Sequence, residues 1–223
     1  MAAFGERLRA ERHARGWPIE RLASASGVSR AMISKIERGE SSPTAVVLGK
    51  LSAALELSVS ELLGPREPGA GNLAGGQAAA GDGDGARLAG GQAGAGDGKR
   101  LAGGQAAEGG GGGVRRAADT PEWRDPDTGY LRRQVSTPRF PAAVTEVTLP
   151  PGARVPYPAG AYAFIAQLVW VLSGQLTLTD GAAVHALAAG DTFELGEPRP
   201  REFRNEGTGD CRYVVVVTRM ATP

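Results

Sequence analysis

Apolar residues in the first 63 positions recur at helical spacing, most clearly between residues 28 and 40. Read as a helix, this segment places Met32, Ile33 and Ile36 on one side. The opposite side is small and cationic, and it consists of Arg30, Ala31, Ser34, Lys35 and Arg38. Such a helix suits insertion into a DNA major groove, although an ordinary amphipathic surface helix has the same pattern.

The ends of this helix carry their own chemical signals. Ser29 is placed to cap the N-terminus and Gly39 to end the helix. Val28 precedes the cap and can pack on Ile33, as a hydrophobic staple does. These signals predict a helix over residues 29–38.

Four further helices are predicted around it. Phe4, Leu8 and the stem of Arg12 line a first helix, and Pro18 opens a second that stops at Gly27. A fourth helix has Ser42 as its cap, Pro43 at its first position and an apolar face made of Val47, Leu48, Leu51, Ala54 and Leu55. A last short turn starts with the capping-box sequence of residues 58–61. Residues 1–63 are therefore predicted to form a five-helix domain.

The hydrophobic pattern disappears between residues 64 and 119. Residues 64–114 contain twenty Gly and twelve Ala among fifty-one, and the phrase Leu-Ala-Gly-Gly-Gln-Ala occurs three times at irregular spacing. Each repeat has a single Leu to bury, so no packed repeat can form. We expect a disordered Gly/Ala-rich linker that joins two domains flexibly.

Residues 120–223 alternate short apolar runs with turn sequences. Leu176 and Leu178 alternate with polar neighbours, as in a half-buried strand, whereas residues 169–172 and 214–217 resemble strands covered on both faces. Strands are predicted over residues 130–136, 142–149, 163–173, 175–179, 183–187, 192–195, 201–205 and 211–219. About eight strands in a hundred residues indicate an antiparallel β-sandwich or barrel.

Composition narrows the function classes. The net charge is only +1, and residues 1–63 carry nine Lys or Arg against seven Asp or Glu, so phosphate binding would depend on local placement. Two His and one Cys argue against a zinc cluster or a disulfide framework. No apolar run is long enough to cross a membrane, and the charged N-terminus does not look like a signal peptide. We expect a soluble cytoplasmic protein.

Residues 5–63 resemble the helix-turn-helix domain of the Xre/Cro/C1 family of bacterial transcriptional regulators. The matching residues are Gly5-Glu-Arg-Leu-Arg, Arg12, Gly16-Trp17, Leu22-Ala23, Gly27-Val-Ser29, Ile33-Ser-Lys-Ile-Glu37-Arg-Gly39-Glu, Pro43-Thr and Leu48 through Leu63. The resemblance implies that the helix at 29–38 reads double-stranded DNA, with the helix at 19–26 lying across the backbone. A bacterial regulator of this kind is expected to be associated with the nucleoid when bound.

The resemblance also assigns roles to individual side chains. Base edges would be read by Arg30, Ala31, Ser34 and Lys35, and phosphates would be held by Ser29, Arg38, Ser41 and Ser42. Arginine and lysine prefer guanine, so at least one G·C pair is expected in each half-site. A phosphate contact is the alternative role for Arg30 or Lys35. Arg12 and Glu37 occupy positions where family members often pair a buried arginine with a carboxylate.

Residues 120–223 resemble a cupin domain. Pro151-Gly152, Gln167, Gly174, Gly190-Asp191 and Asn205 fall at places of the two cupin motifs. The metal-binding cupins use histidines and a glutamate, but here Gln167 stands at the glutamate position and Arg201 at the histidine position of the second motif. A transition metal needs several imidazole or carboxylate ligands, so no metal or other cofactor is expected.

The remaining polar and aromatic residues suggest a binding pocket in the mouth of the barrel. Its predicted lining consists of Tyr157, Tyr162, Gln167, Trp170, Arg201 and Asn205, with Arg201 as the charge partner of a small anion or carboxylate. The alternative is a barrel filled by its own side chains that serves only to form a dimer.

Together these features predict a sequence-specific transcriptional regulator and not an enzyme. It would have a helix-turn-helix domain at 1–63, a linker at 64–119 and a metal-free cupin-like domain at 120–223 that binds a small effector or forms a homodimer. The alternatives are an antitoxin-like or scaffold DNA-binding protein that acts through a protein partner, and a cupin enzyme fused to a DNA reader.

Overall fold

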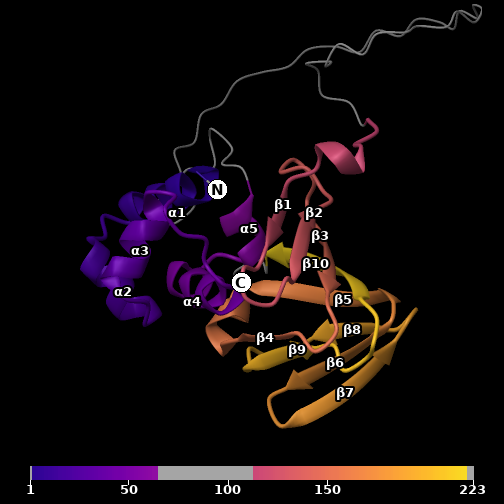
Figure 1. The fold of residues 1–223 in the computed structure, drawn as a ribbon. Coiled ribbons are helices and arrows are strands. Elements are labelled where there is room, and N and C mark those ends of the chain that lie inside the picture. Colours follow the sequence, from indigo (N-terminus) through magenta and orange to yellow (C-terminus); the bar gives the residue numbers. More distant parts are fainter. Residues whose placement is uncertain (1, 65–112, 220–223) are drawn as a thin grey trace, which may run out of the picture. The chain divides into compact units, whose positions relative to one another are not determined.

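A computed structural model describes residues 2–64 and 113–219 of the chain (Figure 1). The five helices near the N-terminus and the strands that follow residue 116 belong to one compact unit. Residues 65–112, on which most of the linker prediction rests, lie outside the described residues. At the end of the predicted linker, Ala117–Asp119 form a 3-10 helix, η1. No helix within the described ranges is long and apolar enough to cross a membrane.

The five predicted helices are present. They are α1 (Ala2–Ala14), α2 (Ile19–Ser26), α3 (Arg30–Glu37), α4 (Ala45–Leu55) and α5 (Val59–Leu63). Ser29 caps α3 by accepting a hydrogen bond from the Met32 N–H at 3.2 Å. Ser58 and Glu61 form the predicted capping box of α5.

The predicted start of the fourth helix is wrong by two residues. The N-cap of α4 is Thr44, whose hydroxyl accepts a hydrogen bond from the Val47 N–H at 3.3 Å. Pro43 precedes the helix and is buried. Both Ser42 and Thr44 suit the cap position by residue type, so the sequence signal was ambiguous.

The helical core brings α1 against the end of α3. Leu8, Leu22, Ile33 and Ile36 are buried almost completely. At Gly5, an added Cβ would lie 2.3 Å from the Ile36 carbonyl oxygen, so only glycine permits this approach. Met32, predicted to share the buried side with Ile33 and Ile36, is instead 37% exposed.

The β domain consists of two antiparallel sheets (Figure 1). The six-stranded sheet has the order β1-β2-β3-β10-β5-β8, and the four-stranded sheet has the order β4-β9-β6-β7. The strands are β1 (Glu122–Arg124), β2 (Leu131–Gln134), β3 (Ala143–Leu149), β4 (Arg154–Tyr157), β5 (Ile165–Ser173), β6 (Gln175–Asp180), β7 (Ala183–Ala188), β8 (Thr192–Leu195), β9 (Arg201–Arg204) and β10 (Cys211–Arg219). All eight predicted strands occur within their predicted ranges or within one residue of them.

Two strands were not predicted from the pattern. Strand β1 has only three residues, and its single buried side chain, Trp123, stands between two charged residues. Strand β4 contains Pro156, which reads as a strand breaker. Because β4 is at the edge of its sheet, Pro156 occupies a position where a strand tolerates proline.

Helix α4 packs directly on the β domain, within the same compact unit. An added Cβ at Gly49 would lie 2.7 Å from Cδ1 of Tyr157, so the backbone of α4 touches this ring. The Asp125 carboxylate accepts a hydrogen bond from the Ala45 N–H, at the first turn of α4. Helix α4 also contacts η2 (Ala159–Tyr162), a 3-10 helix. The helical domain therefore contacts the β domain directly, through α4.

Candidate DNA-binding surface and β-domain cavity

Helix α3 buries one side and exposes the other. Ile33 and Ile36 are buried, whereas Arg30, Ala31 and Lys35 are exposed and Ser34 is half-buried. Gly27 ends α2 in the left-handed region, with φ of 65°, and its N–H donates to the Ala23 carbonyl at 2.9 Å. This tight turn lets α3 start three residues later, which gives the helix-turn-helix arrangement. The residues predicted to read bases thus share one accessible side.

Two arginines of this surface are engaged by acidic side chains of the chain itself. Arg30 Nη1 lies 3.3 Å from Glu20 Oε1 of α2, and Arg38 Nε lies 2.5 Å from Glu40 Oε1. Arg38 also donates a hydrogen bond to the Ser34 hydroxyl. The Arg38 guanidinium lowers the pKa of Glu40, and a backbone hydrogen bond together with Arg30 lowers the pKa of Glu20. Phosphates or bases would have to displace these exposed carboxylates.

The three serines predicted as phosphate contacts differ in their surroundings. Ser29 is exposed, and its oxygen already accepts the capping hydrogen bond, which leaves its O–H able to donate. Ser41 is half-buried, with its Oγ 3.9 Å from Met32 Sδ. The Ser42 oxygen is buried without a hydrogen-bond partner in the described residues. Their roles toward phosphate stay a prediction.

Arg12 and Glu37 form a nearly buried ion pair between α1 and α3. Arg12 Nε donates to Glu37 Oε1 at 2.7 Å, and Nη2 donates to Oε2 at 2.8 Å. Arg12 Nη1 also donates to the Trp17 carbonyl at 2.8 Å. The hydrogen bond to Glu37 raises the pKa of Arg12. This fork-shaped pair fixes the end of α3 on α1.

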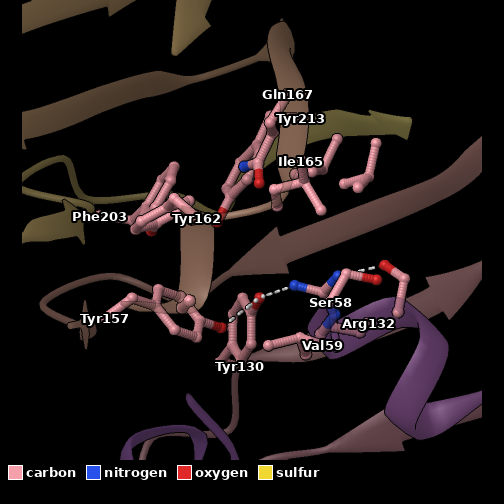
Figure 2. Close-up of a pocket in the computed structure, with 14 residues that line it drawn as sticks. Ser58, Val59, Tyr130, Arg132, Tyr157, Tyr162, Ile165, Gln167, Phe203 and Tyr213 are labelled. Atoms are coloured by element: carbon pink, nitrogen blue, oxygen red, sulfur yellow. Dashed lines mark hydrogen bonds between the residues drawn. The ribbon is translucent and has the colours of Figure 1, made fainter. Parts of the chain in front are cut away.

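A cavity of about 30 Å³ lies inside the β domain beside α5 (Figure 2). Of the predicted pocket residues, Tyr157, Tyr162 and Gln167 line it. Figure 2 shows Tyr157, Tyr130 and Arg132 joined by hydrogen bonds along one side. The remaining lining consists of Ser58, Val59, Ser60, Ala161, Ile165, Phe203, Tyr213, Val215 and Val217.

The other three predicted pocket residues, Trp170, Arg201 and Asn205, lie outside the lining of this cavity. Trp170 is on the outer side of β5 and is 47% exposed, because Val169 and Val171 take the inward positions. The Arg201 guanidinium is occupied by Asp180 at 2.9 Å and stacks over the Tyr162 ring, 4.5 Å from its centroid. Arg201 thus already has a counter-ion within the chain.

Asn205 has a structural environment. Its Nδ2 donates to the carbonyls of Leu149 and Gly209, both at 2.8 Å, and its Oδ1 accepts from the Gly207 N–H at 2.9 Å. These three hydrogen bonds hold the turn after β9. Both polar atoms of this buried side chain are therefore engaged within the chain.

The buried cavity residue that sequence reasoning missed is Arg132. It stands on β2 between Leu131 and another arginine, so the local pattern gives no sign that it is buried. Only the position of Tyr130, two residues earlier and on the same side of the strand, hints at an inward direction. In the structure Arg132 is 7% exposed and lines the cavity.

The donor set does not fit the metal of the metal-binding cupins. The cavity side chains described here are tyrosines, serines, one glutamine, one arginine and apolar residues, with no imidazole and no carboxylate among them. Across residues 2–64 and 113–219, no three His, Cys, Asp or Glu side chains gather as a metal site would need. Arg201, at the histidine position of the second motif, places a buried cation there.

An exposed recognition helix after a tight turn, joined to two antiparallel sheets, defines a helix-turn-helix protein with a cupin domain. Family models agree with this assignment: a "Helix-turn-helix" model matches residues 8–62, and a "Cupin domain" model matches residues 145–217.

Curated relatives place the chain more closely. It is 34% identical over 64 residues to the uncharacterised HTH-type transcriptional regulator YazB of Bacillus subtilis and covers 93% of that protein. The chain belongs to the family of HTH-type transcriptional regulators. It is 47% identical over 58 residues to the HTH-type transcriptional regulator SutR of Escherichia coli. That match covers 26% of this chain and only 33% of SutR.

One solved structure has the same fold over nearly the whole chain. It is the crystal structure of an HTH_3 family transcriptional regulator from Vibrio cholerae, which is 18% identical. The match has a TM-score of 0.64 and covers 99% of this chain and 97% of the other.

Proposed function

We propose that this regulator binds specific double-stranded DNA sequences through α3. Arg30, Ala31, Ser34 and Lys35 would face base edges, and Ser29, Arg38, Ser41 and Ser42 would hold phosphates. The observation that carries the proposal is the accessible side of α3, which presents these small and cationic residues over the buried Ile33 and Ile36.

Selection from random duplexes tests sequence specificity directly. The purified full chain is mixed with a library of random double-stranded DNA, and bound molecules are recovered and sequenced over several rounds. The expected result is an enriched, two-fold symmetric motif with guanine in each half-site, which footprinting on the genome then locates. Recovery of random sequences at every round would contradict the proposal.

We propose that the active form is a homodimer joined through the β domain. Support comes from the outer side of the six-stranded sheet, where Leu168, Trp170, Val214 and Val216 are neighbours across β5 and β10. Trp170 is 47% exposed at this apolar surface, and the other three are half-buried. A two-fold dimer would present two α3 helices to half-sites about 34 Å apart, one turn of DNA.

The β domain is proposed to sense a small ligand without a metal and without catalysing a reaction. The cavity and its Arg132 support binding, and the poor fit of the donor set to a metal supports a cofactor-free role. The division into a reader at 1–63, a connection at 64–119 and a sensor at 120–223 belongs to this proposal. So does action in the cytoplasm, where the DNA is.

A further inference from the structure

Three arginines are buried in the described residues: Arg12, Arg132 and Arg201. Two of them have a carboxylate partner, since Arg12 pairs with Glu37 and Arg201 pairs with Asp180. None of the ion pairs within the described ranges includes Arg132. Burial of a guanidinium without a counter-ion is costly, so Arg132 is the exception that needs an explanation.

The hydrogen bonds of Arg132 all go to neutral oxygens. Its Nη1 donates to the Tyr130 hydroxyl at 2.8 Å, and its Nη2 donates to the Ser60 hydroxyl at 3.0 Å. The buried Nε has no hydrogen-bond partner in the described residues. Hydroxyl oxygens are weaker acceptors for a guanidinium than a carboxylate is, so donor capacity remains for an anion.

Space for an anion exists next to this guanidinium. Arg132 lines the cavity of about 30 Å³ together with Tyr130, Tyr157 and Gln167, and it also borders a second cavity of about 50 Å³. The acid among these linings is Glu122 of the second cavity, an exposed residue on β1. The first cavity would admit about two water-sized groups, which suits an acid of a few heavy atoms.

The lining also matches a carboxylate with a short apolar tail. Ile165, Phe203, Val215 and Val217 supply apolar surface, and the hydroxyls of Tyr130 and Tyr157 lie 3.3 Å apart beside Arg132. Burial raises the pKa of Tyr157 well above its ordinary value, so its hydroxyl keeps a proton to donate at neutral pH. A carboxylate here would meet a cation and hydrogen-bond donors.

We propose that this cavity binds the carboxylate of a small monocarboxylic acid, with Arg132 as its counter-ion. The proposal deepens the sensing role proposed above. It also connects the ligand to the helices, because Ser60 belongs to α5 and accepts from Arg132 while also bonding to Thr145 Oγ1 of β3 at 3.0 Å. A carboxylate that accepts from Arg132 Nη2 competes with Ser60, so occupancy changes how α5 is held.

Calorimetric titration of the full chain with sodium acetate tests the site. Because the experiment contains no DNA, its outcome is independent of whether the proposed DNA recognition is correct. Four proteins are compared: wild type, Arg132→Met, Arg132→Lys and Arg133→Gln. Arg133 is the matched control, since it is the next residue of β2, points to the other side and pairs with Glu146. Sodium chloride at equal ionic strength is the second titrant.

Acetate should bind wild type and Arg133→Gln equally and bind Arg132→Met more than tenfold more weakly. Arg132→Lys, which keeps the charge, should recover part of the affinity and guards against misfolding of the methionine variant. Absence of acetate binding to wild type, or equal binding by Arg132→Met, would overturn the proposal. Chloride binding as tight as acetate binding would show an inorganic-anion site and overturn the carboxylate assignment.

Discussion

The guanidinium of Arg12 donates two hydrogen bonds, of 2.7 and 2.8 Å, to the carboxylate of Glu37. Their side chains are only 9% and 8% exposed, and the two residues are 25 positions apart in the sequence. Because Glu37 is the last residue of α3, the pair fixes the recognition helix at its C-terminal end.

Loss of this pair should destabilise the protein strongly. Glu37→Gln leaves the Arg12 cation buried without its carboxylate, and we expect a loss of about 3 kcal/mol in the free energy of unfolding. Urea denaturation followed by circular dichroism measures it. Glu40→Gln, which breaks the exposed pair with Arg38, is the control and should change the midpoint little. Equal midpoints for Glu37→Gln and wild type would show that the pair contributes nothing.

Arg30→Ala should reduce binding to the selected DNA site by about 1–3 kcal/mol and relax one base position, because the variant cannot make the proposed bidentate contact to guanine. Fluorescence anisotropy with the selected duplex and with a random duplex measures both effects. Arg38→Ala should instead weaken binding to both duplexes alike, as expected for a phosphate contact. If Arg30→Ala lost the same affinity for random DNA, Arg30 would be a backbone contact.

Glu20→Gln should strengthen DNA binding several-fold. In the free chain Glu20 holds Arg30 at 3.3 Å, and it also places a negative charge beside the surface that meets phosphates. The gain should shrink as salt rises, because both charges are exposed and screened. Anisotropy titrations at two salt concentrations measure the change in DNA affinity. Weaker DNA binding by Glu20→Gln than by wild type would mean that Glu20 instead positions Arg30 for DNA.

Trp170→Arg should convert the proposed dimer into a monomer, since it places a charge in the apolar outer surface of the six-stranded sheet. Analytical ultracentrifugation of the full chain measures the change. Val184→Arg is the matched control, because Val184 is 61% exposed on β7 of the other sheet. A dimer that persists in Trp170→Arg would place the interface elsewhere.

The protein should lose stability as the pH rises above 10. Burial raises the pKa of Tyr157, Tyr162 and Tyr213 above the ordinary value of 10.0, so the folded state favours protonated hydroxyls. These tyrosines make their full contribution to the free energy of unfolding below pH 10. That contribution is lost as the pH rises, because the tyrosines of the unfolded chain lose their protons first. Urea midpoints between pH 8 and 11 measure the loss, and Tyr213→Phe should flatten it. Midpoints independent of pH would contradict the prediction.

The sequence predicted most helices and strands well, because the local capping and alternation signals agree with the packing of the folded chain. Ser29 and Ser58 cap helices where their residue types indicate, and the alternation of Leu176 and Leu178 reflects two buried positions of β6. The candidate pocket was harder to predict. Arg132 and Arg201 are both arginines on strands, and only the tertiary position of Asp180 decides which of them has a counter-ion.

The contact between the helices and the β domain was equally hidden from the sequence. Gly49 looks like an unremarkable interruption of an apolar helix, yet its missing side chain makes room for the Tyr157 ring. The expected flexible linker gives no hint of this contact or of the hydrogen bond from the Ala45 N–H to Asp125.

The close contact between α4 and Tyr157 limits how freely the helical domain or the β domain can be exchanged with that of another regulator. A foreign reader with alanine or a larger residue at the position of Gly49 would bring a methyl group to 2.7 Å from the tyrosine ring. Such a chimera would have to move its helix away from the ring, which would disturb the hydrogen bond from the Ala45 N–H to Asp125. The helical domain and the β domain are thus matched at this contact, and a graft must carry the glycine and its tyrosine together.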